Sequence, residues 1–252
     1  MMVMALVAGG VVGLAMGALG GGGGVLAVPA LIYLLGMTPS AAATASLLIV
    51  SVTSVVALSR HARGGDICWR TGLLFAGAGV PVSAGAAVLS GHVPAWLLTA
   101  AFALLAGVAS VVLLGTEPTE STVDAPVRAA RAVGAGAGLG AVTGLLGVGG
   151  GFLAVPTLVT ALSLRMRVAI GTSLLVIAVN SLVALGTRLA TTPTPMNWPV
   201  IAPFAAAAIL AAWDGRRLSA ALSPTTLRRA FGIALALVAT AMLADLTLHA
   251  LR

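Results

Sequence analysis

The chain repeats itself at an offset of 127 residues. The segment GLAMGALGGGGGVLAVPAL (13–31) aligns without gaps to GAVTGLLGVGGGFLAVPTL (140–158), and 12 of the 19 positions are identical. The same offset pairs SLLIVSVTSVVAL (46–58) with SLLVIAVNSLVAL (173–185). An internal repeat of this length indicates two homologous halves, which we place at 1–115 and 128–252, joined by the acidic linker 116–127.

The composition decides what kind of fold the two repeats build. Hydrophobic residues make up 60% of the 252 positions and charged residues only 8%, and apolar runs recur along nearly the whole length. This is typical of an all-α polytopic membrane protein, with the lipid bilayer as its surroundings. The net charge is +7, from thirteen basic residues that are all arginine and six acidic residues. Because no basic patch is interleaved with aromatic residues, we expect no nucleic-acid partner.

Each repeat opens with an apolar stretch that glycines interrupt midway, at 20–24 in the first repeat and at 147–151 in the second, where Val148 breaks the run. A straight helix of about 35 residues would measure roughly 52 Å, against a hydrocarbon core of about 30 Å. The stretch is therefore either one broken helix or a hairpin that reverses at the glycines. Three further helices follow in each repeat, near 38–59, 70–90 and 94–115, and then near 168–188, 197–215 and 224–248.

The thirteen arginines distinguish these two topologies. If each stretch crosses the membrane once, the loops divide the arginines seven to six, which is no bias. If each stretch reverses, only Arg188 and Arg252 lie on one face. The other face then holds Arg60, Arg63, Arg70, Arg128, Arg131, Arg165, Arg167, Arg216, Arg217, Arg228 and Arg229. This positive-inside pattern predicts inverted-topology repeats with both termini outside the cytoplasm and the linker inside.

The glycine breaks are the strongest candidates for a binding site. In hydrocarbon, irregular backbone is tolerated only where protein or water covers it, and transporters place substrate between broken helices of inverted repeats. We expect short helices to begin at Val25 and Phe152. Their N-terminal amides, meeting near the membrane midplane, would attract a small anion. The glycines spaced four apart at 9, 13 and 17, and at 136, 140 and 144, are instead expected to allow close helix packing.

Polar side chains recur at equivalent positions in the helix that follows each break. Singly, Ser and Thr in membrane helices most often bond to their own i−4 carbonyl. Their duplication makes them candidates to line a pathway, and Asn180 is the most informative, because a buried amide needs several partners. The predicted substrate-binding residues are Gly21, Gly22, Gly23, Gly24, Pro29, Ser46, Thr53, Gly149, Gly150, Gly151, Pro156, Thr172, Ser173 and Asn180.

Ionisable residues are few and give no indication of catalysis. Cys68 is the single cysteine, which excludes an intrachain disulfide and a cysteine metal site. His61 and Asp66 are expected in a cytoplasmic loop, and Asp214, Arg216 and Arg217 at a helix end. We therefore expect no enzyme activity, no metal and no cofactor.

The chain resembles the TauE/SafE family of sulfite exporters. The resemblance is carried by the paired motifs GGGGGVLAVPAL and GVGGGFLAVPTL, by RHARGGDICW (60–69) and by GRRLSAALSPTTLRRAF (215–231). It implies a secondary transporter that exports sulfite or organosulfonates across a bacterial inner membrane. An importer, a channel for another small anion, or a membrane scaffold without transport stay open as alternatives, as does a homodimeric state.

Overall fold

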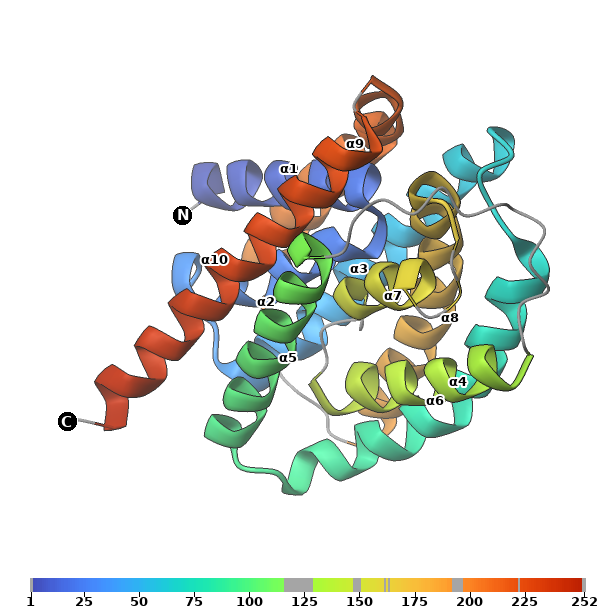
Figure 1. Cartoon of the computed structure of the whole chain (residues 1–252). Helices are drawn as coiled ribbons and strands as arrows, with labels where there is room; N and C mark the ends of the chain where they lie inside the picture. The colour runs from blue at the N-terminus through green and yellow to red at the C-terminus, as the bar shows by residue number, and fades with distance from the viewer. Residues whose placement is uncertain are drawn as a thin grey trace.

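The computed structural model describes residues 2–115, 129–146, 151–160, 162, 164–191, 197–221 and 223–250, and its regular elements there are all helical (Figure 1). The first repeat contains α1 (Met2–Leu19), the 3₁₀ helix η1 (Gly20–Leu26), α2 (Ala27–Pro29), the π-helix η2 (Ala30–Leu34), α3 (Pro39–Arg63), α4 (Trp69–Leu89), η3 (Ser90–His92) and α5 (Ala95–Gly115). The second contains α6 (Ala129–Leu146), α7 (Gly151–Thr160), α8 (Met166–Thr191), α9 (Trp198–Ala221) and α10 (Pro224–Ala250). The three helices expected after each glycine break are confirmed.

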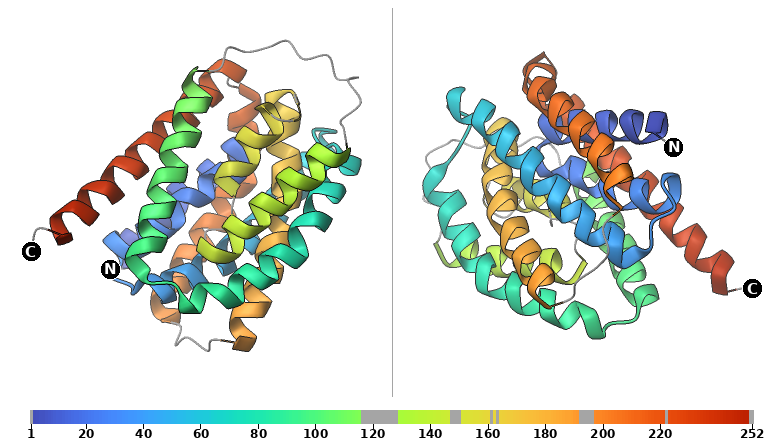
Figure 2. Two further views of the ribbon diagram at one scale, coloured as in Figure 1. Left: turned by 60° about the horizontal axis from the view of Figure 1, so that its bottom comes forward. Right: turned by 180° about the vertical axis from the view of Figure 1, so that it is seen from behind.

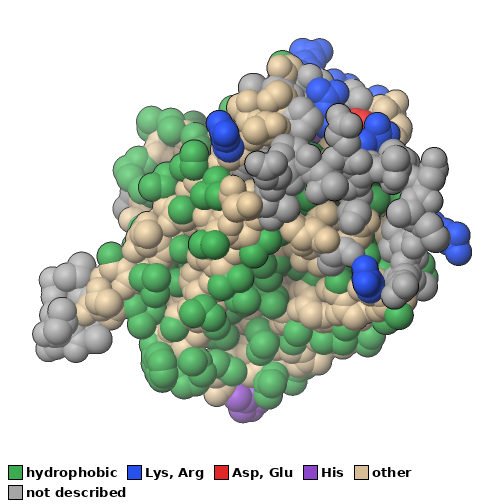
Figure 3. Space-filling model, in the orientation of Figure 1, with side chains coloured by type: hydrophobic (Ala, Val, Ile, Leu, Met, Phe, Trp, Pro, Cys, Tyr) green, Lys and Arg blue, Asp and Glu red, His purple; other side chains and the backbone are tan. Residues whose placement is uncertain are grey.

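Most of these helices have the length and surface of membrane spans. Within the described residues, α1, α3, α4, α5, α8, α9 and α10 are long and apolar enough to cross a bilayer. Large apolar side chains such as Val111 and Leu210 are 72% and 74% exposed, as lipid contact allows. Figure 3 shows hydrophobic side chains over much of one face and basic side chains gathered toward one end. The prediction of an all-helical polytopic membrane protein is confirmed.

The centre of the molecule is formed by α3 and α8. In the most apolar stretch of each helix, 67% of the residues of α3 and 78% of those of α8 are buried, against 28–44% in the other five spanning helices. Leu47 of α3 clusters with Leu185 of α8, and Ala57 of α3 with Leu174 of α8, so the two helices run antiparallel. The outer pair α5 and α10 is antiparallel as well, with Leu114 near Gly232 and Gly107 near Ala239 (Figure 2).

Each repeat packs its first helix against a helix of the other repeat, α1 on α9 and α6 on α4 (Figure 1). Gly13 of α1 lies against the backbone of Ala208 in α9, and Gly140 of α6 lies against the backbone of Gly79 in α4. The predicted packing role is therefore confirmed for both glycine stripes. The contacts made by one stripe are mirrored by the other, at repeat-equivalent positions.

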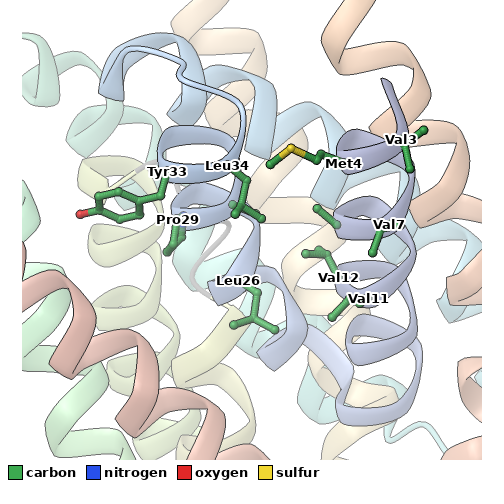
Figure 4. Close-up of a pocket in the computed structure, with 11 residues that line it drawn as sticks. Val3, Met4, Val7, Val11, Val12, Leu26, Pro29, Tyr33 and Leu34 are labelled. Carbon is green, nitrogen blue, oxygen red and sulfur yellow. The ribbon is translucent and has the colours of Figure 1, made fainter. Parts of the chain in front are cut away.

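The first glycine break reverses the chain. Gly20 adopts φ +70, a left-handed conformation open to glycine, and the following segment returns alongside α1. Val3 and Met4 at the start of α1 consequently line the same groove as Tyr33 and Leu34 at the end of η2 (Figure 4). This agrees with the hairpin alternative for the first repeat. In the second repeat, 147–150 lie outside the described residues.

The glycine stripes give a matched test of helix packing. A Cβ at Gly13 would meet the carbonyl oxygen of Ala208 and lie 2.6 Å from its Cα, whereas a Cβ at Gly10 has nothing within 4 Å. We expect Gly13→Ala to lower the free energy of unfolding by about 1–3 kcal/mol, since backbone cannot move aside as a side chain can. Gly10→Ala should leave thermal stability unchanged or slightly raised, because alanine is the better helix former. Equal melting temperatures in detergent would contradict this account.

Candidate functional site

The first glycine break contacts the start of α8. A Cβ at Gly20 would lie 2.7 Å from Ser173 Oγ and 2.9 Å from the carbonyl oxygen of Ile170. Both α8 residues fall in its first two turns. α8 is 26 residues long, so Ser173 lies roughly 8 Å along the axis from its middle. Because residues 147–150 lie outside the described residues, the expected meeting of the two breaks near the membrane midplane stays a prediction.

The glycine run itself is helical, not open. η1 begins at Gly20, and the helical path then continues through α2 and η2 to Leu34. The predicted helix start at Val25 is therefore wrong for the first repeat. Consecutive glycines carry no side chains to crowd the tighter 3₁₀ winding, so the helix can start directly at the turn. In the second repeat Gly151 is already helical in α7, and residues 147–150 before it lie outside the described residues.

Ser173, which lies against Gly20, and its neighbour Thr172 are both fully buried. Thr172 Oγ1 accepts a hydrogen bond from the backbone N–H of Cys68 at 3.0 Å, and Ser173 Oγ donates to the carbonyl of Ile170 at 2.7 Å. Next to them, Gly171 lies against the carbonyl of Asp66. The start of α8 thus brings together the first glycine break, two hydroxyl groups and the connection between α3 and α4.

His61 belongs to the same neighbourhood. We expect His61 in a cytoplasmic loop, but it lies in the last turn of α3 and its side chain is 2% exposed. Its Nε2 is 3.2 Å from the carbonyl oxygen of Gly17, three residues before the turn at Gly20. Its Nδ1 is 3.8 Å from Asp66 Oδ2. In the sequence, one feature could have drawn attention to His61. The offset of 127 aligns it with Arg188, so both repeats carry a basic residue at this position.

Asn180 lies further along α8, seven residues or about 10 Å beyond Ser173. It is fully buried, and neither its Nδ2 nor its Oδ1 has a hydrogen-bond partner. Its amide faces the α4–α6 crossing, where a Cβ at Gly79 would lie 2.6 Å from Asn180 Nδ2. Because seven residues are close to two helical turns, Ser173 and Asn180 share one face of α8. Two further buried hydroxyls without a partner, Ser54 and Ser181, occupy equivalent positions in α3 and α8.

Two other predicted residues make the local bonds usual for membrane helices. Ser46 Oγ donates to the carbonyl of Ala43 at 2.9 Å, and Thr53 Oγ1 donates to the carbonyl of Ile49 at 2.6 Å. Thr53 Oγ1 also lies 3.1 Å from the sulfur of Met16. Both side chains are fully buried in α3, and neither contacts Gly20 in the contacts described for that glycine.

The two predicted prolines lie in different surroundings. Pro156 is buried within α7. Pro29 instead lines an apolar groove of about 590 Å³ between α1 and the returning segment, whose lining residues are all hydrophobic or aromatic (Figure 4). At one end of this groove Tyr33 donates a hydrogen bond to Asp245 of α10 at 3.0 Å. The groove offers Pro29 no polar neighbour for an anion.

The remaining predicted residues are glycines of the two breaks. Gly24 is buried within η1, and Gly21, Gly22 and Gly23 precede it in the same 3₁₀ helix. Gly151 opens α7, whereas Gly149 and Gly150 lie outside the described residues. Within the part of the chain that the structure describes, no group of three His, Cys, Asp or Glu side chains could hold a metal ion.

The comparisons with known proteins match this architecture. The family model described as "Sulfite exporter TauE/SafE" covers residues 5–242. A "Probable membrane transporter protein" of Xylella fastidiosa strain Temecula1 is 33% identical over 245 residues, which cover 94% of this chain and 93% of that protein. Another protein of that name, from strain 9a5c, is 34% identical over 187 residues and 72% of each chain.

No solved structure matches this chain significantly. The family model spans nearly all of the chain, and the relatives are named as transporters and not as enzymes. With its several membrane-spanning helices, this chain is therefore a multi-pass membrane transporter that belongs to the TauE/SafE sulfite exporter family.

Proposed function

We propose that the chain is a secondary transporter that exports small sulfur-containing anions, such as sulfite or organosulfonates, from the bacterial cytoplasm. The observation that carries the proposal is the contact of the first glycine break with Ser173 at the start of α8. The description of the matching family, a sulfite exporter, supports the substrate class and the direction.

The chemistry of this neighbourhood suits a weakly solvated oxyanion. The first amides of a helix have no carbonyl partner within it and carry a partial positive charge, so they favour a negative ligand. Gly20 begins a helical path that continues to Leu34, and the hydroxyl of Ser173 lies beside Gly20. We propose that Gly149, Gly150 and Gly151 of the second break supply the corresponding donors from the other repeat.

The arrangement of the repeats supports an alternating-access mechanism. The equivalent helices α3 and α8 pack antiparallel at the centre of the molecule, and antiparallel equivalents are the expected result of inverted-topology repeats. We propose that the two repeats rock about this pair. Both termini would then lie outside the cytoplasm of an inner-membrane protein, and a homodimer is compatible with the apolar outer faces.

The direct test is anion flux through purified protein in liposomes. We expect sulfite or sulfoacetate loaded inside to leave proteoliposomes faster than empty liposomes, with saturation at rising concentration. An efflux rate that rises linearly with anion concentration, without saturating, would favour a channel. Transport of the anion only toward the cytoplasmic side of the protein would favour an importer. Absence of flux for every anion of a panel, with a protein partner that co-purifies, would favour a scaffold and overturn the proposal.

Gly20 and Gly36 form a matched pair for testing the glycine break. Both adopt positive φ, +70 and +66, so alanine costs about 1–2 kcal/mol of backbone strain at either position. Only a Cβ at Gly20 would press on Ser173, while a Cβ at Gly36 has nothing within 4 Å. We expect Gly20→Ala to lower the transport rate about tenfold or more relative to Gly36→Ala. Equal transport by the two variants would exclude this break from the pathway.

Asn180→Leu separates a pathway role from a structural one. The amide makes no hydrogen bond, so an apolar side chain of similar shape should leave thermal stability unchanged or raise it. If Asn180 contacts the passing anion, the same variant should lower the transport rate. A loss of stability with unchanged transport per folded molecule would show that the amide serves packing alone.

A further inference from the structure

Arg188 lies in the last turn of the membrane-spanning helix α8, eight residues beyond Asn180. Its side chain is half-buried and its Nε is fully shielded from solvent without a hydrogen-bond partner. The only hydrogen bond described for it runs from Nη2 to Ser90 Oγ in η3, at 3.0 Å. Of the five donors of this permanent cation, Nη2 bonds to Ser90 and the shielded Nε has no described partner.

No carboxylate among the described residues forms an ion pair with Arg188. Three of the six acidic residues, Glu117, Glu120 and Asp124, lie outside the described residues. Asp66 faces His61, and Asp214 pairs with Arg217 at 3.5 Å near the end of α9. Asp245 accepts the hydrogen bond of Tyr33. A charge removed from water without a counter-charge is costly, and in membrane proteins such residues mark ion and substrate pathways.

The surroundings of Arg188 connect it to the end of the glycine stripe in α6. Ser90 donates a hydrogen bond to the carbonyl of Ala87 at 2.7 Å, and a Cβ at Gly144 would lie 2.8 Å from the backbone nitrogen of Ala87. Gly144 is the last glycine of its stripe before the break at 147–151. At the repeat-equivalent position, His61 contacts Gly17 just before the first break. His61 thus contacts the end of the α1 stripe directly, and Arg188 is linked to the end of the α6 stripe through Ser90 and Ala87.

Arg188 also extends the polar face of α8. Ser173, Asn180 and Arg188 are spaced seven and eight residues apart, so they lie within roughly a quarter turn of one another around the helix. Along the axis they cover about 22 Å. The order along the helix is a hydroxyl beside the first break, an amide without partners at the middle and a guanidinium at the far end.

We propose that Arg188, positioned by Ser90, binds the transported oxyanion at the end of the pathway opposite the Gly20 break. The inference rests on the proposed function. It adds a positively charged binding residue to a pathway whose other proposed groups are amides and hydroxyls. A guanidinium fork donates hydrogen bonds to two oxygens of a sulfite, sulfonate or sulfate group at once. The same chemistry would hold a lipid phosphate, so the test separates a free anion from a headgroup.

The test measures anion binding as thermal stabilisation of the purified protein in uncharged detergent. Sodium sulfite and sodium sulfate are titrated at constant ionic strength with sodium chloride as the reference. We expect Arg188→Gln to raise the half-maximal anion concentration about tenfold or more, because it removes charge-assisted hydrogen bonds. Arg70→Gln is the matched control: Arg70 is exposed at the start of α4, and its loss should leave the half-maximal concentration unchanged.

The outcomes distinguish the two proposals. Wild type and Arg188→Gln responding equally, with flux in liposomes intact, would overturn the role of Arg188 and leave the proposed function standing. No response of the wild type to any anion, together with no flux, would overturn both. Should Arg188→Gln fail to fold, Arg188→Lys replaces it; this variant keeps the charge but loses the fork, and an unchanged half-maximal concentration would overturn the proposal.

A second experiment, in lipid nanodiscs, tests whether the oxyanion bound by Arg188 is a free anion or a lipid phosphate. Wild type and Arg188→Gln are reconstituted in nanodiscs of phosphatidylcholine alone and with phosphatidylglycerol added. We expect sulfite to stabilise the wild type equally in both. A different result would overturn the proposal: phosphatidylglycerol stabilises the wild type, Arg188→Gln abolishes this stabilisation, and sulfite neither adds to it nor reverses it. The guanidinium would then bind a lipid headgroup.

Discussion

Backbone-to-backbone contact between the repeats is the interaction on which the rest of the structure depends. In α1 and α6 the glycines spaced four apart remove every side chain from one face, so carbonyls of α9 and α4 lie directly against their Cα atoms. Between helices in a bilayer the hydrophobic effect contributes little, and close packing of this kind supplies the attraction. Because each contact joins one repeat to the other, neither repeat has its complete set of neighbours alone.

The packing of α1 on α9 and of α6 on α4 encloses α3 and α8. It therefore determines where polar side chains can be kept away from lipid. Ser, Thr and Asn side chains are tolerated on these helices because α4, α9 and the broken segments cover them. Most hydroxyls there bond to their own helix. Asn180, Ser54 and Ser181 do not, and unsatisfied buried polar atoms are uncommon enough in native proteins to need an explanation. Occupation by a passing polar ligand is such an explanation, and it links the packing to the proposed transport.

Several features of the site could be predicted from residues alone. The glycines at 20–24 break an apolar stretch too long for one span, which required a turn or a kink, and Gly20 provides the turn. The stripe of Gly9, Gly13 and Gly17 indicated close packing, as observed. The helix start was misplaced at Val25 because a glycine run has no propensity signal that distinguishes a 3₁₀ helix from a loop. His61 was assigned to a loop because a basic residue after an apolar run usually marks the membrane surface.

The sequence by itself determined the class of fold, the duplication and the positions of the breaks, because these follow from local hydrophobicity, glycine content and self-similarity. The tertiary structure alone decided which helix each glycine stripe contacts, that Gly20 lies on Ser173 and that His61 is buried against Gly17. It also decided that Arg188 has a serine and no described carboxylate beside it. These facts depend on contacts between residues more than 40 positions apart, and no periodicity along the chain encodes which distant helix a given face will meet.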